Sequence, residues 1–146
     1  MIDALGEQLD ENLHNELLNI YKTLLVNPVG AILQLSRAGL LFMELLFASV
    51  GASRPSDNLW DCIVRAGKGD EGKKIKGLGI LPDEIASLLH TIRTYANKAD
   101  HATEKIHLTV EDAEICLRLF LRVLKWFYFE YNGESKNPRA RSESGF

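Results

Sequence analysis

Apolar residues recur at intervals of three and four positions through most of this chain, which is the periodicity of amphipathic α-helices. The pattern predicts long helices over residues 3–26, 29–50 and 83–101 and a fourth from Thr109 to about Phe129. A short helix is expected to run through Leu59, Trp60, Ile63 and Val64. The period of two that marks half-buried strands is not found in the sequence.

The segment from Val29 to Val50 is apolar nearly all round, so we expect it to be the central helix, with Leu45 among its buried residues. It carries two charges, Arg37 and Glu44. Partly buried charges need partners, and Arg93 and His101 are candidates to share their neighbourhood. The first helix carries a near-heptad seam that can pack on the body of the molecule or on a second copy of the chain.

Start and stop signals separate these segments. Asn27 is a candidate N-cap with Pro28 at the first helical position, and Thr109 is a candidate N-cap for the last helix. Ser56 or Asp57 is expected to cap the short helix, and Gly51 to end the helix before it.

We therefore predict an all-α fold, an antiparallel helical bundle of four long helices and one short helix. The 146 residues fit one domain over residues 1–131, followed by a polar tail over 132–146 that we expect to be disordered or a linker. The longest apolar run is broken by Glu44 and is too short to span a bilayer. Cys62 and Cys116 have no CxxC spacing and favour buried, reduced thiols in a cytoplasmic protein.

A glycine-rich basic segment, residues 66–79, interrupts the helical pattern. Gly67 to Lys73 satisfies GxxxxGK, but Lys74 follows instead of Ser or Thr, and neither a buried strand nor an adjoining helix is predicted. We interpret the segment as a flexible basic loop and not as a nucleotide-binding P-loop. The net charge of −3 means that any contact with nucleic acid must come from such a local patch. The candidate ligand-binding residues are Lys68, Lys73, Lys74 and Lys76.

One polar row follows the margin of the helix over residues 83–101. Its members are spaced by three and four positions and therefore share a face: His90, Arg93, Asn97 and His101. Arg93, Asn97 and His101 are the candidate catalytic residues, because a guanidinium can neutralise a phosphate and an imidazole can transfer protons. The structural interpretation is also open: Asn97 and His101 would satisfy backbone groups, and Arg93 would pair with Glu44 or Glu84. The histidines show no metal-ligand spacing, and neither a metal nor another cofactor is predicted.

The order of these elements resembles the HEPN superfamily of helical domains, particularly its prokaryotic branch called domain of unknown function 4145. The resemblance covers roughly residues 25 to 130 and is carried by Asn27-Pro28, the helix with Arg37 and Glu44, the Leu88 to His101 stretch and the start of the last helix. Active members of that superfamily are dimeric, metal-independent endoribonucleases of defence and toxin–antitoxin systems, in which two Arg-x(4–6)-His helices meet in one cleft. The resemblance thus implies a HEPN-like bundle, a homodimer, and Arg93, Asn97 and His101 as site residues.

The chain departs from that pattern at one position. Ala96 stands where the family has its arginine, and Arg93 precedes His101 by eight residues, about 12 Å along the helix and about 80° round it. We therefore expect a HEPN-like module of a prokaryotic defence or toxin-type system that binds RNA or a nucleotide, or dimerises for a partner protein, with weak or no catalysis. The alternative is a dimeric metal-independent endoribonuclease that uses the Arg93, Asn97 and His101 face. Neither hypothesis involves a membrane.

Overall fold

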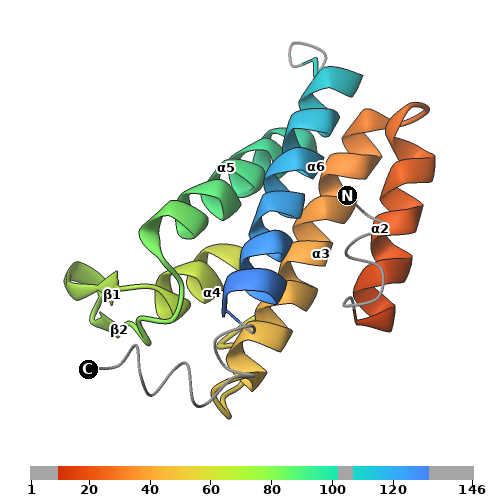
Figure 1. Ribbon diagram of the computed structural model, residues 1–146. Helices are drawn as coiled ribbons and strands as arrows, with labels where there is room; N and C mark the ends of the chain where they lie inside the picture. The colour runs from red at the N-terminus through yellow and green to blue at the C-terminus, as the bar shows by residue number, and fades with distance from the viewer. Residues whose placement is uncertain (1–9, 102–106, 132–146) are drawn as a thin grey trace.

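A computed structural model describes residues 10–101 and 107–131 of the chain. Within these ranges the fold is all-α, as the sequence predicts, with four long helices and one short helix (Figure 1). The helices are α2 (Glu11–Leu24), α3 (Pro28–Ala48), α4 (Leu59–Ala66), α5 (Asp83–Asp100) and α6 (Val110–Lys125). Six residues of π-helix, η2 (Trp126–Tyr131), continue α6. The predicted tail over residues 132–146 lies outside the described residues.

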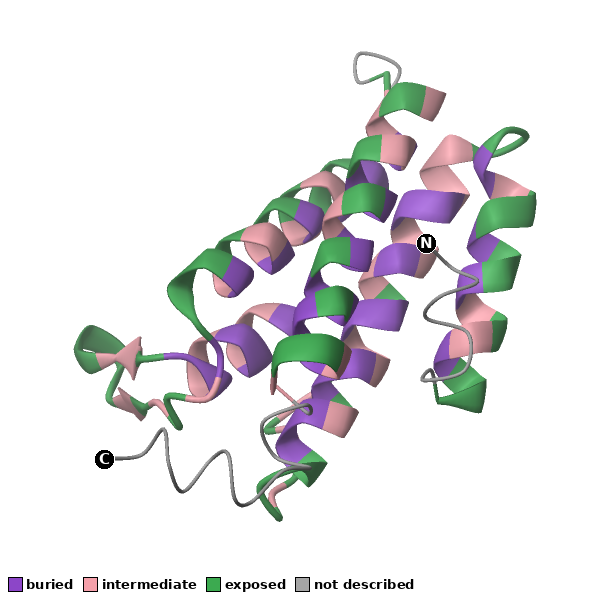
Figure 2. Cartoon of the chain, viewed as in Figure 1, coloured by how far each residue is buried: buried purple, intermediate pink, exposed green. Residues whose placement is uncertain are grey.

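The helix α3 is the centre of the bundle, as its apolar composition predicts. It packs on α2, α4, α5 and α6, and nine of its residues are buried. Consecutive long helices run in opposite directions, and α2 and α5 lie on opposite sides of the α3–α6 pair (Figure 1). Buried positions form continuous stripes on the inward faces (Figure 2). The helix α3 is also long and apolar enough to cross a membrane by length and composition, a property that the core helix of a bundle shares.

The helix ends show why most boundaries are predictable. Asn27 Oδ1 accepts a hydrogen bond from the backbone N–H of Gly30 at 3.0 Å, with Pro28 at the first turn. Thr109 and Asp112 form a reciprocal capping box at the start of α6. Gly51 adopts the positive φ of 72° that suits a helix stop. The prediction for the short helix is wrong in detail, because Asn58, and not Ser56 or Asp57, caps α4.

The charges within α3 are placed differently from the prediction. Arg37 and Glu44 are exposed, and Glu44 pairs with Arg54 at 3.0 Å instead of with a residue of α5. Glu84 pairs with Arg122 of α6 at 3.1 Å. Both carboxylates proposed as partners of Arg93 are therefore bound to other arginines, and that part of the structural interpretation is wrong.

One prediction about burial also needs correction. Leu45 is only half-buried, and its neighbours Phe42 and Leu46 fill the core instead. In the first helix the inward stripe comprises Leu13, Leu17, Ile20 and Leu24. The predicted seam, for which packing on a second copy of the chain is one alternative, also includes Tyr21 and Leu25, and these are 45% and 74% exposed. The part of the seam that precedes residue 10 lies outside the described residues.

The π-helix at the end of α6 gathers aromatic rings against α3. Phe127 meets Phe42 edge to face, with 5.4 Å between ring centroids, and stacks on Tyr131 at 5.6 Å. The hydroxyl of Tyr131 shares a hydrogen bond with Ser49 Oγ at 2.8 Å. This end of α6 is therefore fixed to the far end of α3 by packing and by a polar contact.

Candidate functional site

The glycine-rich segment forms a short hairpin, where the sequence analysis predicts a loop. The strands β1 (Gly69–Asp70) and β2 (Ile75–Lys76) pair antiparallel, and a single 3₁₀ turn, η1 (Glu71–Lys73), connects them. Gly69 has a φ of +78°, which a residue with a side chain rarely adopts. The segment that matches GxxxxGK is this hairpin, and the next helix, α5, begins only at Asp83. The phosphate-cradling geometry of a P-loop is therefore absent from it.

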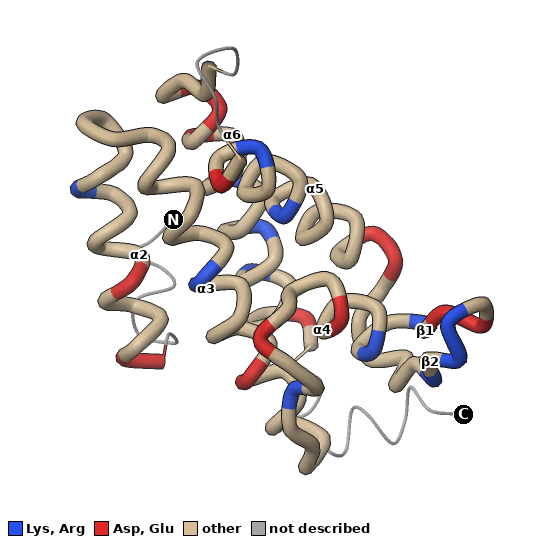
Figure 3. The backbone as a smooth tube through the Cα atoms, turned by 180° about the vertical axis from the view of Figure 1, so that it is seen from behind, with Lys and Arg blue, Asp and Glu red and all other residues tan. Residues whose placement is uncertain are grey.

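The hairpin is the most basic part of the described surface. Four lysines lie on it or beside its first strand, and Arg65 from the end of α4 anchors it by donating to the backbone carbonyl of Lys76. Blue cationic positions gather there around two acidic ones, whereas charges of both signs are scattered over the helices (Figure 3). The lysines that the sequence analysis selects are thus brought together: Lys68, Lys73, Lys74 and Lys76.

An aromatic ring lies directly beneath this cationic hairpin. The Nζ atom of Lys73 lies 4.3 Å from the ring centroid of Trp60, which is half-buried on α4. A cation over an indole face is attracted by the quadrupole of the ring. The sequence analysis did not select Trp60, because no local pattern shows which helix the hairpin will cover.

A shallow pocket of about 300 Å³ adjoins the hairpin. Its walls come from α4, from the start of the hairpin and from the first half of α5, and its apolar lining includes Ile63 and Val64. Across it, Lys68 Nζ contacts Asp83 Oδ2 at 3.4 Å, and both side chains are largely exposed. The pocket therefore presents a donor and an acceptor beside an apolar surface, next to the basic hairpin.

His90 contributes the only imidazole to this pocket. Arg93 Nε donates to His90 Nδ1 at 3.4 Å, one helical turn away. Burial, and secondarily the charge of Arg93, lower the pKa of His90 below its ordinary value. The ring is therefore neutral near pH 7, and its other nitrogen carries the proton.

The predicted polar row does not form one site within a single chain. His90 and Arg93 belong to the surface beside the hairpin, whereas Asn97 lines a different groove of about 380 Å³ between α3 and α5. His101 is exposed at the C-terminal cap of α5, where its backbone N–H donates to the carbonyl of Asn97 at 3.0 Å. The row is continuous along the helix, but its members face different neighbours.

The groove that contains Asn97 supplies an arginine that the sequence analysis did not connect to the row. Arg37 of α3 lines the groove together with Asn97 and Asp100. Ala96, at the position of the family's arginine, is 6% exposed and lies in the same groove against α3. The arginine in the lining of this groove is thus Arg37 and not Arg93. A sequence signal existed, since Arg37 is a charge within an apolar helix, but the sequence analysis names Arg93 and His101, and not Asn97, as the residues near it.

Among residues 10–101 and 107–131, no group of three or more histidine, cysteine, aspartate or glutamate side chains has the geometry to hold a metal ion. Comparison of the chain with protein-family models, with curated proteins and with solved structures gives no match. The resemblance to HEPN domains therefore stays a prediction from the residues themselves.

Proposed function

We propose that the protein is a single-stranded RNA-binding module, a HEPN-like domain of a prokaryotic defence or toxin-type system with little or no catalytic activity. The observation that carries the proposal is the contact of Lys73, on the hairpin, with Trp60 of α4. Three further lysines lie on the hairpin or beside its first strand. Proteins that bind single strands combine a cationic track for the phosphates with an aromatic face for the bases. RNA is preferred over DNA because of the resemblance to HEPN domains.

The arrangement suits a single-stranded RNA that passes over the hairpin. Lys73, Lys74 and Lys76 are exposed and can each neutralise a phosphate. A base could take the place of the Lys73 ammonium on the Trp60 ring, and the displaced ammonium would then meet the adjacent phosphate. The pocket with Lys68 and Asp83 lies next to this path and could receive a neighbouring base or a free nucleotide.

Three features of α5 support weak or absent catalysis. Arg93 is hydrogen-bonded to His90, Ala96 is packed against α3, and His101 is exposed at the helix end. A general base and a phosphate-binding arginine must converge on one reacting group to accelerate cleavage. Within one chain the predicted catalytic residues do not converge.

The dimeric metal-independent endoribonuclease is kept as a second candidate because of Arg37. This guanidinium shares a groove with Asn97, one turn before His101, and could serve as the phosphate ligand that Arg93 cannot provide. Cleavage by this site would persist in EDTA, would leave a cyclic phosphate, and would be lost in both Arg37→Ala and His101→Ala. Loss of cleavage in Arg93→Ala alone would contradict the role of Arg37.

The binding proposal is tested with a fluorescently labelled single-stranded RNA and fluorescence anisotropy. We compare the triple variant Lys73→Ala, Lys74→Ala and Lys76→Ala with a control triple that removes the same charge from exposed helical positions, Lys22→Ala, Lys98→Ala and Lys125→Ala. The hairpin triple should weaken binding by about tenfold or more and reduce the salt slope by roughly two, since each single-strand phosphate contact contributes about 0.7. If the two triple variants weaken RNA binding equally, the interaction depends on net charge alone and the proposal is overturned.

Stacking on Trp60 has its own readout. The chain contains two tryptophans, so Trp126→Phe leaves Trp60 as the single indole. Its fluorescence should be quenched as RNA is added, and Trp60→Leu should weaken binding by roughly 1–3 kcal/mol. If the fluorescence of Trp60 is quenched but Trp60→Leu does not lower the affinity, the ring lies near the bound RNA but does not contribute to binding.

A further inference from the structure

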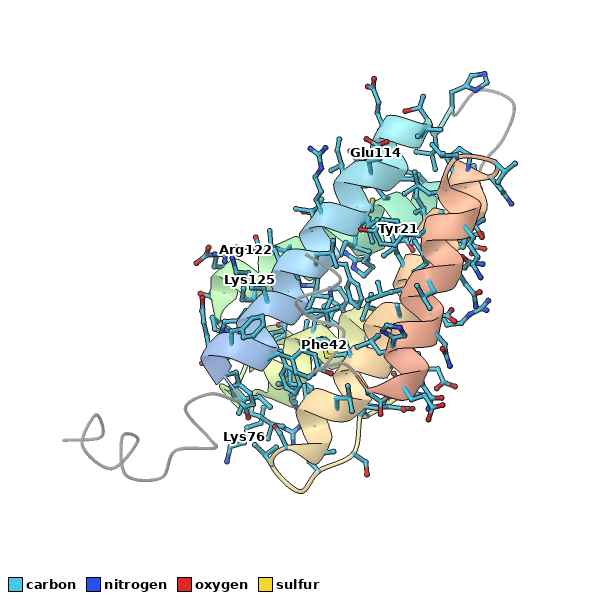
Figure 4. The ribbon with its side chains drawn as sticks, turned by 45° about the vertical axis from the view of Figure 1, so that its right-hand side comes forward. Tyr21, Phe42, Lys76, Glu114, Arg122 and Lys125 are labelled. Atoms are coloured by element: carbon cyan, nitrogen blue, oxygen red, sulfur yellow. The ribbon has the colours of Figure 1, made fainter. Side chains whose placement is uncertain are left out.

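The face of the bundle opposite α5 carries an open groove between α2 and α6. Its volume is about 390 Å³, and its floor includes Leu117 and Leu121. Tyr21 and Leu25 form the wall on α2. Glu114 and Arg118 form the wall on α6, and Figure 4 shows Tyr21 and Glu114 across the groove from each other.

The wall on α2 exposes more apolar surface than the fold requires. Tyr21 is 45% exposed, Leu25 is 74% exposed, and the next residue, Val26, is 83% exposed. Leu18, one turn before Tyr21, is 38% exposed. Contiguous apolar surface of this kind on a small protein marks an interaction site, because leaving it in water costs free energy that a partner would recover.

The charges on the opposite wall indicate what covers this surface. Glu114 and Arg118 are four residues apart on one face of α6, and among the described residues neither forms an ion pair. If two α6 helices lie antiparallel about a two-fold axis midway between Glu114 and Arg118 on their outward face, Glu114 of each chain faces Arg118 of the other. A wall that presents one acid and one base at this spacing is therefore complementary to itself.

We propose that the α2–α6 groove is the interface with a second copy of this chain, with Tyr21 and Leu25 as its apolar contacts and reciprocal Glu114–Arg118 pairs. The inference does not depend on RNA binding. It also differs from the dimer that the HEPN resemblance implies, because α5 and the hairpin lie on the other side of the α3–α6 pair (Figure 1). The two basic hairpins would remain free, and the two α5 helices would not meet.

Analytical ultracentrifugation of the full chain tests the interface. The wild type should dimerise at micromolar concentration, and Leu25→Glu should raise the dissociation constant at least about tenfold. Val50→Glu is the matched control, because Val50 is an equally apolar residue, 45% exposed, outside the groove. Circular dichroism should show the same helix content in all three proteins, because both substituted side chains are solvent-exposed.

A charge-reversal cycle identifies the ion pairs. Glu114→Arg alone places two arginines opposite each other and should weaken the dimer, whereas Glu114→Arg combined with Arg118→Glu should restore it. A wild-type monomer at about 100 µM, or a dimer insensitive to Leu25→Glu, would overturn the proposal. If removal of residues 1–9 converts a monomer into a dimer that Leu25→Glu disrupts, the occupant in the intact chain is that segment and the proposal is equally overturned.

Discussion

Arg93 donates its Nε–H to Nδ1 of His90 at 3.4 Å, and this contact defines the electrostatic state of the pocket beside the basic hairpin. The accepting nitrogen must be unprotonated, so the neutral ring presents an N–H at Nε2. Burial disfavours the imidazolium form first, and the adjacent guanidinium disfavours it further. His90 therefore offers this pocket a hydrogen-bond donor without adding positive charge.

The pKa of His90 should be measurably lower than the ordinary value of 6.5 in a titration followed by NMR. Arg93→Ala removes the charge but not the burial, so the pKa should rise and still remain below that value. A pKa of His90 that does not respond to Arg93→Ala would show that the contact is absent in solution.

The same shift predicts a loss of stability in mild acid. Above pH 6.5 both the folded protein and the unfolded chain hold the neutral ring, and there is no penalty. As the pH falls below that value the unfolded chain takes up the proton first, so the free energy of unfolding decreases until the folded ring also protonates. His90→Gln should flatten this part of the profile of urea midpoint against pH. An unchanged profile would assign the acid sensitivity to other groups.

Leu46→Ala should cost about 2–5 kcal/mol of the free energy of unfolding, because Leu46 is fully buried in the central helix and its truncation leaves a cavity. Leu45→Ala should cost distinctly less, since Leu45 is half-buried. Chemical denaturation of the two variants measures the difference. The two substitutions are matched, because each replaces a leucine by alanine and the two positions are adjacent in the chain. If the two midpoints reverse, the inward face of α3 is assigned wrongly.

Gly77→Ala should disrupt the hairpin. A Cβ atom at Gly77 would overlap the carbonyl oxygen of Gly67 and the backbone of Lys68, and neither is free to move without breaking the strand pair. Gly72→Ala is the matched control, because a Cβ there meets only the side chain of Asp70 at 3.3 Å. RNA affinity should fall in the first variant and persist in the second, while helix content by circular dichroism stays constant in both.

Both thiols should be inert until the protein unfolds. Burial raises the pKa of Cys62 and raises that of Cys116 to about 12, so neither forms the reactive thiolate near pH 8. Ellman's reagent should therefore detect neither cysteine in the native protein and both in concentrated urea. Rapid reaction of one thiol in the native state would show that its side chain is exposed by local opening.

The sequence predicts what is encoded locally. The bounds of α3, α5 and α6 follow from apolar spacing and from caps such as Asn27 and Thr109, since a cap and its helix lie within a few residues of each other. The hairpin is missed because two-residue strands in a glycine-rich segment leave no alternation to detect. Helical periodicity is the wrong test for such a segment.

The candidate site is predicted only in part for a related reason. The lysines of the hairpin are correctly grouped because they are close in sequence, whereas Trp60 joins them only through the fold. Similarly, spacing places Arg93 and Asn97 on one side of α5 but cannot show which helix lies beside each of them. The partner of Glu44, which is Arg54, and the groove shared by Arg37 and Asn97 are both tertiary facts.

The π-helical end of α6 has a consequence for how this protein can change by insertion and deletion. A π-helix is wider than an α-helix and accommodates roughly one extra residue per turn. Loss of one residue between Trp126 and Tyr131 would convert the segment to α-helical winding and would leave the direction of Tyr131 nearly unchanged, because the wider π turn absorbs the extra residue. Phe127 and Tyr131 would then be three residues apart on an α-helix and would both still face α3. This end of the helix is therefore compatible with the loss of one residue, whereas the loss of two would turn Tyr131 away from α3.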